Sequence, residues 1–299
     1  AINGSDTVSL GIALTTTGTN QGIDTNNVAD TDDGNTITVS DTGSITTTVF
    51  YAHGIYSKGD DNKTTLSGSI TTAGEDAYGI WNKGASNETT LSGRIETTRD
   101  YAYGIYNQGN TNTTTVSGSI TTGVVGTNAG EDSTGIWNYG NDNTTTLTST
   151  GVITVNGLKA DGIYNSGDKN ITIVHGSIFV NGDGVADDGA EGLVNSGNNN
   201  KTTLSGSITT TGINAEGIAN RGNGNEVTVS GTVKATGASS AALYNESGSG
   251  NSFTLNKGAT IIGDIIAIDH TTAAYDATNS KLIFNLGAST SYAYSVSGK

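Results

Sequence analysis

The sequence has no cysteine, proline or methionine among its 299 residues. Without cysteine there is no disulfide framework, no thiolate zinc site and no thiol nucleophile. Positive charge is scarce too, because 13 Lys and Arg stand against 28 Asp and Glu and leave a net charge of −15. A chain of this sign does not neutralise phosphates, so we expect neither nucleic acid nor an anionic membrane surface as its partner.

Long apolar runs are also missing. No stretch approaches the roughly 18 consecutive apolar residues of a transmembrane helix, and residues 1–4 lack the basic and apolar regions of a signal peptide. We therefore expect a soluble chain that is not embedded in a membrane and from which any leader has been removed.

Glycine is abundant, with 44 residues, and it marks an internal repeat. The block reads approximately G-I-(Y/W)-N-x-G-x-x-N-x-T-T-L-S-G-S-I-T-T, and the commonest distance between blocks is 25 residues. Extra residues enter mainly before the opening glycine, as in residues 123–132 and 182–188. Insertions that fall at the same place in each repeat indicate a coil of similar turns in which only the corner loops differ in length. The opening position is held by Gly22, Gly54, Gly79, Gly104, Gly135, Gly162, Gly192, Gly217 and Ala242.

Each block holds three short runs of strand-forming residues, exemplified by residues 77–81, 89–92 and 94–98. Apolar and polar residues alternate within the runs, and no window shows the 3.6-residue period of a helix. The pattern predicts an all-β fold, a right-handed parallel β-helix (solenoid) with three short strands per turn of about 25 residues. Stacked turns would align one apolar column made of Ile23, Ile55, Ile80, Ile105, Ile136, Ile163, Leu193, Ile218 and Leu243.

Three segments are expected: an N-terminal cap over residues 1–21, β-helix repeats over 22–257 and an irregular C-terminal cap over 258–299. The repeat fades after Leu255, and the tail is more densely apolar, with Lys281 to Phe284 and the aromatic Tyr292 and Tyr294. A cap is needed because exposed strand edges at the end of a solenoid would promote aggregation.

Two columns of asparagine recur at the corners. Asn tolerates left-handed backbone angles and its amide can bond to the amides above and below it, so we interpret the columns as asparagine ladders. Asn62, Asn87 and Asn112 also match N-x-T glycosylation sequons, but the ladder explains their spacing without sugar. The first column comprises Asn35, Asn62, Asn87, Asn112, Asn143, Asn170, Asn200, Asn225 and Asn251, and the second comprises Asn82, Asn107, Asn138, Asn165, Asn195, Asn220 and Asn245.

The tandem G-I-Y-N-x-G…N-T-T-T-L-S-G-S-I-T-T unit, over roughly residues 22–255, resembles the passenger domains of Gram-negative (type V secretion) autotransporters of the adhesin type. The run from Ile261 to Ile265 looks like the junction and autochaperone region of that family. The resemblance implies an outer-membrane barrel that this sequence does not include, display at the cell surface or secretion by a Gram-negative bacterium, and a role in adhesion, aggregation or virulence. It does not specify a ligand.

Catalytic motifs are missing, so we expect no enzyme, no cofactor and no metal site. The three histidines, His53, His175 and His270, are expected to be exposed, and they form no shared repeated site. The sequence has no G-x-S-x-G elbow, no H-E-x-x-H and no phosphate-binding G-x-x-x-x-G-K-(S/T).

Carboxylates gather in the variable corner of the repeat. We interpret them as a solvated acidic face, with calcium at the longer loops as an alternative. Paired acids of a polysaccharide-degrading enzyme are a second alternative, and Arg94 and Arg99 near Asp100 come closest to the non-repeating group it would need. The acidic positions are Glu75, Asp76, Asp100, Glu131, Asp132, Asp161, Asp187, Asp188, Glu191 and Glu216.

Aromatic residues follow the core isoleucine in five successive turns, and alternation points them outward. They are suited to bind sugar rings or a protein partner, and they could equally form a self-stacking ladder that shields the turn. The candidate ligand-binding residues are Tyr56, Trp81, Tyr106, Trp137 and Tyr164, with Tyr78 and Tyr103.

The leading hypothesis is therefore a bacterial surface adhesin that binds a host receptor, a glycan or another copy of itself by many weak contacts along one face. A polysaccharide-degrading β-helix is the alternative. A remote alternative is an ice-binding solenoid, which would use the outward threonine array that includes Thr65, Thr90 and Thr115.

Overall fold

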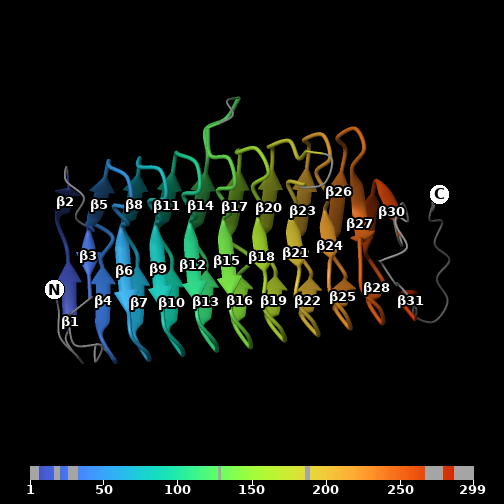
Figure 1. The fold of residues 1–299 in the computed structure, drawn as a ribbon, viewed down its shortest axis with the longest axis horizontal. Helices are drawn as coiled ribbons and strands as arrows, with labels where there is room; N and C mark the ends of the chain where they lie inside the picture. Colours follow the sequence, from blue (N-terminus) through green and yellow to red (C-terminus); the bar gives the residue numbers. More distant parts are fainter. Residues whose placement is uncertain are drawn as a thin grey trace.

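The computed structural model describes residues 7–16, 21–25, 33–126, 129–185, 189–266 and 279–285. These residues form three long parallel sheets that wind into a right-handed β-helix of about ten turns, as the repeat predicted. The turns lie side by side along one axis, with the N-terminal strands at one end and the last strands at the other (Figure 1).

Each turn contributes one strand to each sheet, and all pairings are parallel. The first sheet contains β1 (Thr7–Leu10), β4 (Thr36–Val39), β7 (Lys63–Leu66), β10 (Glu88–Leu91), β13 (Thr113–Val116), β16 (Thr144–Leu147), β19 (Ile171–Val174), β22 (Lys201–Leu204), β25 (Glu226–Val229), β28 (Ser252–Asn256) and β31 (Lys281–Asn285). The second contains β2 (Ala13–Thr16), β5 (Ser44–Thr47), β8 (Ser69–Thr72), β11 (Arg94–Thr97), β14 (Ser119–Thr122), β17 (Val152–Val155), β20 (Ser177–Val180), β23 (Ser207–Thr210), β26 (Thr232–Ala235) and β29 (Thr260–Ile262). The third contains β3 (Ile23–Asp24), β6 (Ile55–Lys58), β9 (Ile80–Lys83), β12 (Ile105–Gln108), β15 (Ile136–Tyr139), β18 (Ile163–Asn165), β21 (Leu193–Asn195), β24 (Ile218–Asn220), β27 (Ala241–Asn245) and β30 (Asp264–Ile266).

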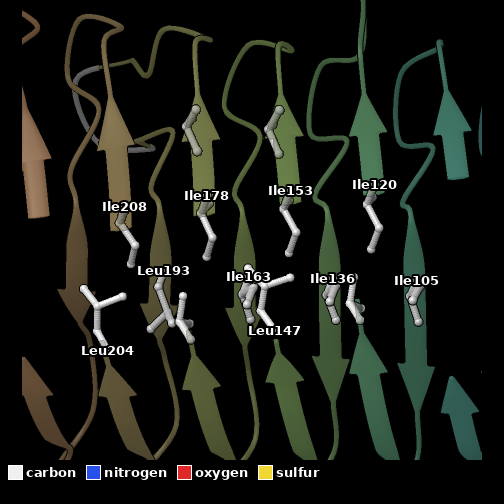
Figure 2. Close-up of a cluster of buried hydrophobic side chains, with 14 of the residues drawn as sticks. Ile105, Ile120, Ile136, Leu147, Ile153, Ile163, Ile178, Leu193, Leu204 and Ile208 are labelled. Atoms are coloured by element: carbon white, nitrogen blue, oxygen red, sulfur yellow. The ribbon is translucent and has the colours of Figure 1, made fainter. Parts of the chain in front are cut away.

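The core is a narrow apolar column that runs the length of the coil. Equivalent residues pair from turn to turn, so that Ile80 lies between Ile55 and Ile105. The predicted column is buried throughout, from Ile23 at 7% exposed to Leu243 at 0%. Figure 2 shows its isoleucines and leucines stacked in rows that follow the turns. One turn alone encloses almost nothing, so burial arises from stacking.

The opening glycine of each block faces this column. A Cβ at Gly104 would lie 2.4 Å from Cγ2 of Ile120 and 2.5 Å from the carbonyl oxygen of Gly135. Neither atom can move without disturbing the core or the next turn. The first eight blocks keep glycine at this position because a side chain would enter space that the core already fills, and the ninth block carries the small side chain of Ala242 there.

Both asparagine columns form ladders, but in two different ways. In the second column the amides bond to each other, with Nδ2 of Asn82 donating to Oδ1 of Asn107 at 2.8 Å. In the first column Oδ1 accepts from a backbone amide, as Asn87 does from the N–H of Asn62 at 2.9 Å.

The expectation of left-handed backbone at the ladder asparagines was wrong for both columns. The second column lies within strands of the third sheet rather than at a corner. In the first column the residue before the asparagine has the positive φ, for example Asp61 at 56° and Ser86 at 58°. The sequon asparagines are 1 to 2% exposed, so their amides are inaccessible to glycosylation in the folded chain.

The sheets extend past both expected cap boundaries. β1 and β2 precede residue 22, while β29, β30 and β31 follow residue 257 and pair with the turn before them. Where the caps begin stays a prediction, and Tyr292 and Tyr294 lie outside the described residues.

The second ladder should carry a measurable share of the stability. Asn138 accepts from Nδ2 of Asn107 and donates to Thr145 and Asn165 at 2.8 to 3.0 Å. Asn138→Ala leaves these buried groups unpaired, so we expect the free energy of unfolding to fall by about 2–3 kcal/mol. Urea unfolding measures it. The outward Thr146→Ala is the control, with an expected change within about 0.5 kcal/mol, and equal effects for the two variants would contradict a stabilising ladder.

Candidate functional site: an aromatic cluster beside buried carboxylates

Two rows of side chains run along the third sheet. From the turn of Gly54 onward, the corner row is the residue just before the opening position of each block, and the strand row is the residue just after each member of the core column. In-register pairing places successive members of a row one turn apart. The corner row comprises His53, Tyr78, Tyr103, Thr134, Asp161, Glu191, Glu216 and Ala241, and the strand row comprises Tyr56, Trp81, Tyr106, Trp137, Tyr164, Val194, Ala219 and Tyr244.

The first members of both rows make one connected set of rings, which we call the aromatic cluster. It comprises His53, Tyr56, Tyr78, Trp81, Tyr103, Tyr106, Trp137 and Tyr164. In the corner row Tyr78 stacks on His53 and on Tyr103, with ring centroids 4.6 and 4.8 Å apart. In the strand row consecutive centroids are 4.6 to 5.9 Å apart. Each such pair contributes about 0.5–1.5 kcal/mol beyond the area it buries.

The structure brings all seven predicted ligand-binding residues together in this cluster, facing away from the core. The rings cover one another, so Tyr103 is buried and the others are half-buried. Ligand binding by them stays a prediction, since stacking and binding both follow from this arrangement.

Three tyrosines at the border of the cluster are more accessible, and the sequence analysis missed them. Tyr51 is 50% exposed, Tyr101 40% and Tyr139 52%. Each lies two residues from a member of a row, so the alternation that selected the rows could also have found them. They widen the aromatic surface that a partner can reach.

His53 is buried, and the expectation of an exposed histidine was wrong for it. Its ring stacks on Tyr78, and its Nδ1 accepts the backbone N–H of Tyr78 at 2.9 Å. Burial lowers the pKa of His53 to about 4, so the ring is neutral at physiological pH. His175 is exposed as expected, and His270 lies outside the described residues.

The corner row changes from aromatic to acidic after Thr134. Asp161 is 7% exposed and Glu191 1%, and Glu216 in the next turn is half-buried. The expected solvated acidic face is therefore wrong for these positions, because they occupy the register of the stacked tyrosines. The one-turn spacing brings carboxylates of like charge close together.

Two features make room for these acids and compensate part of their charge. Residue 189 is glycine, and a Cβ there would lie 2.5 Å from carboxylate oxygens of both Glu191 and Glu216. The guanidinium of Arg221 pairs with Glu191 on one side and Glu246 on the other.

Burial and the adjacent Glu191 still hold the pKa of Asp161 well above its usual range. The same two causes raise the pKa of Glu216 from 4.5 to about 7.

A pocket of 240 Å³ opens where the aromatic part of the corner row meets the acidic part. Thr134 is short, and it leaves a gap between Tyr103 and Asp161, its neighbours in the row. The aromatic lining consists of Tyr101, Tyr103, Trp137 and Tyr164, and the polar lining consists of Asp132, Thr134, Lys159, Asp161 and Arg221.

Arg94 and Asp100, from the group that the sequence placed nearest to an enzyme site, each have a partner outside that group. Arg94 lies on β11 in the second sheet and pairs with Glu96. Asp100 is structural, because its Oδ1 accepts the backbone N–H groups of Gly130 and Glu131 at 2.7 and 3.0 Å. It thereby anchors the long loop before β15.

Calcium at the longer loops stays untested. Asp183 accepts the N–H of Ile213 at 2.8 Å, and Asp187 and Asp188 lie outside the described residues. Within the described ranges, no three His, Asp or Glu side chains gather closely enough to hold a metal ion.

Comparison of the chain with protein-family models, with curated proteins and with solved structures finds no match. None of the described residues belongs to a helix, so this part of the chain has no helix that could cross a membrane.

The buried acids predict an unusual pH dependence. Because the pKa of Glu216 is raised to about 7 from 4.5, the folded chain binds its proton more tightly than the unfolded chain does. This stabilisation is complete below pH 4.5 and is lost as the pH rises through 7. We expect the free energy of unfolding to fall between pH 5 and pH 8, and Glu216→Gln to remove about 1–3 kcal/mol of that fall.

Urea unfolding at the two pH values measures the effect. Glu88→Gln is the control, because Glu88 is an exposed carboxylate that pairs with Lys63 on the first sheet. A Glu216→Gln variant with the pH dependence of the unmodified chain would show that the acid is not held in its protonated form.

Proposed function

We propose that the protein is an adhesin-type rod that attaches a bacterial cell to glycans through its aromatic cluster. The observation that carries this proposal is the cluster itself, in which eight rings on five successive turns form one surface bordered by exposed tyrosines. Aromatic rings bury large areas with little loss of side-chain entropy, and they are enriched where binding energy is concentrated.

The charge of the chain favours neutral glycans over acidic ones. The net charge is −15, and two of the cations nearest the cluster already have partners. Arg221 pairs with Glu191 and Glu246, and Lys159 pairs with Glu131 at 3.0 Å. An anionic sugar would approach a chain of its own sign and would have to displace these two pairs to reach Arg221 or Lys159. Lys83, whose Nζ lies 5.4 Å from the centroid of the Trp81 ring, is a cation at the cluster that stands outside these pairs.

The rod form suits attachment at a distance from the cell. The aromatic cluster lies on β6, β9, β12, β15 and β18 and the turns before them, between the N-terminal end and the middle of the coil (Figure 1). In the autotransporter resemblance the C-terminal end is nearest the outer membrane, so the cluster would be presented outward. Several rods on one cell would add their contacts, so avidity replaces a deep site.

Removing two rings tests the proposal. We expect Trp81→Ala combined with Trp137→Ala to weaken glycan binding at least tenfold, because tryptophans at the centre of an interface contribute about 2 kcal/mol or more. A neutral glycan array, followed by binding of the purified protein to cell surfaces, gives the measurement.

Tyr244→Ala is the matched control. Tyr244 belongs to the strand row but is separated from the cluster by Val194 and Ala219, so its loss should leave binding unchanged. Unchanged binding in a folded double variant would exclude the aromatic cluster as the attachment surface.

Polysaccharide cleavage is a second candidate function, favoured by Asp161. A buried carboxyl group with a raised pKa is the proton donor that glycoside hydrolysis requires, and Asp161 lines a pocket with aromatic walls. Incubation with neutral and acidic polysaccharides tests it by chain length. This second function predicts shortening that Asp161→Asn abolishes, and intact chains at every pH from 5 to 8 would eliminate it.

A further inference from the structure

The pocket between Tyr103 and Asp161 is small and open to solvent. Its 240 Å³ lies below the roughly 300–1,000 Å³ of pockets that take drug-sized ligands. It therefore has room for one small ring rather than for a chain. Its position at the end of the aromatic part of both rows places it where a bound chain would terminate.

The walls of the pocket present ring faces in fixed orientations. Trp137 donates from Nε1 to Oγ of Ser166 at 3.0 Å, which holds the indole in place. Tyr103 meets Trp137 edge to face with centroids 4.9 Å apart, and Tyr164 does so from the other side at 5.7 Å. Apolar faces of this kind receive the C–H face of a sugar ring.

The polar side of the pocket offers hydrogen bonds without a free positive charge. Thr134 and Asp161 contribute a hydroxyl and a carboxyl group, and Oδ1 of Asp161 already accepts the N–H of Glu191 at 2.8 Å. Arg221 and Lys159 are paired with carboxylates. Hydroxyl groups fit this lining, whereas an anionic group would have no unpaired cation to meet.

We propose that this pocket binds a single uncharged pyranose ring, the terminal sugar of a glycan whose remaining rings lie along the aromatic cluster. This inference rests on the proposed glycan attachment, and it adds the site that recognises the chain end. Thr134 is the residue that creates the site, because a ring at its place in the corner row would continue the stack and close the gap.

The test uses calorimetry with the methyl glycosides of glucose, galactose, mannose and N-acetylglucosamine, and with methyl glucuronide as the charged probe. We expect at least one neutral glycoside to bind the unmodified chain, and Thr134→Tyr to weaken that binding at least tenfold. Tyr244→Ala removes an aromatic ring that lies outside the pocket, so this control should bind within about threefold of the unmodified chain.

Two outcomes would overturn the inference. One is that no neutral glycoside binds the unmodified chain or that methyl glucuronide binds better, a result that does not depend on how the variants fold. The other is that Thr134→Tyr, folded by circular dichroism, binds as well as the unmodified chain.

A further variant separates this inference from the proposed function. Tyr56→Ala combined with Trp81→Ala alters the cluster outside the pocket, so it should weaken binding of long glycans and spare the methyl glycosides. If long glycans lose affinity while no glycoside binds the unmodified chain, attachment by the cluster stands and the pocket proposal fails.

Discussion

Hydrogen bonds between the backbones of successive turns are the interaction on which this structure depends. Each strand pairs in register with the strands one turn before and after it, so the N–H of Ile80 bonds to Gly104 and that of Ile55 to Gly79. The pairing fixes which side chains become neighbours, because a residue meets its equivalents in the adjacent turns about 4.8 Å away. Core, ladders and site are all rows produced by this one constraint.

The same stacking serves different chemistry according to what occupies a row. Isoleucines form the core, asparagines satisfy one another's amides in a buried ladder, and aromatic rings stack on one another. Carboxylates are the unfavourable case, because like charges are held together with little water. The chain accommodates Glu191 and Glu216 through Gly189 and Arg221, and the pKa of Glu216 is raised to about 7.

The candidate site exists because the rows are not uniform. If every turn carried a tyrosine at the corner position, the aromatic stack would be continuous and closed. Thr134 interrupts it, and Asp161 begins the acidic part beyond the gap, so the pocket marks the place where the repeat departs from its own pattern. In a coil of similar turns, the positions that break a row are the ones that provide a specific site.

The sequence by itself determined the solenoid, the core column, both asparagine columns and the seven aromatic positions of the cluster. The reason is that in-register pairing places residues one repeat apart in the sequence next to each other in space. Tertiary structure alone decided which polar residues lose their water. His53 and Asp161 occupy the same position in their turns as Tyr78 does. They are buried because side chains of the adjacent turns pack against them. The pocket, the pairing of Arg221 and the raised pKa values follow from that packing in three dimensions, which a repeat period does not specify.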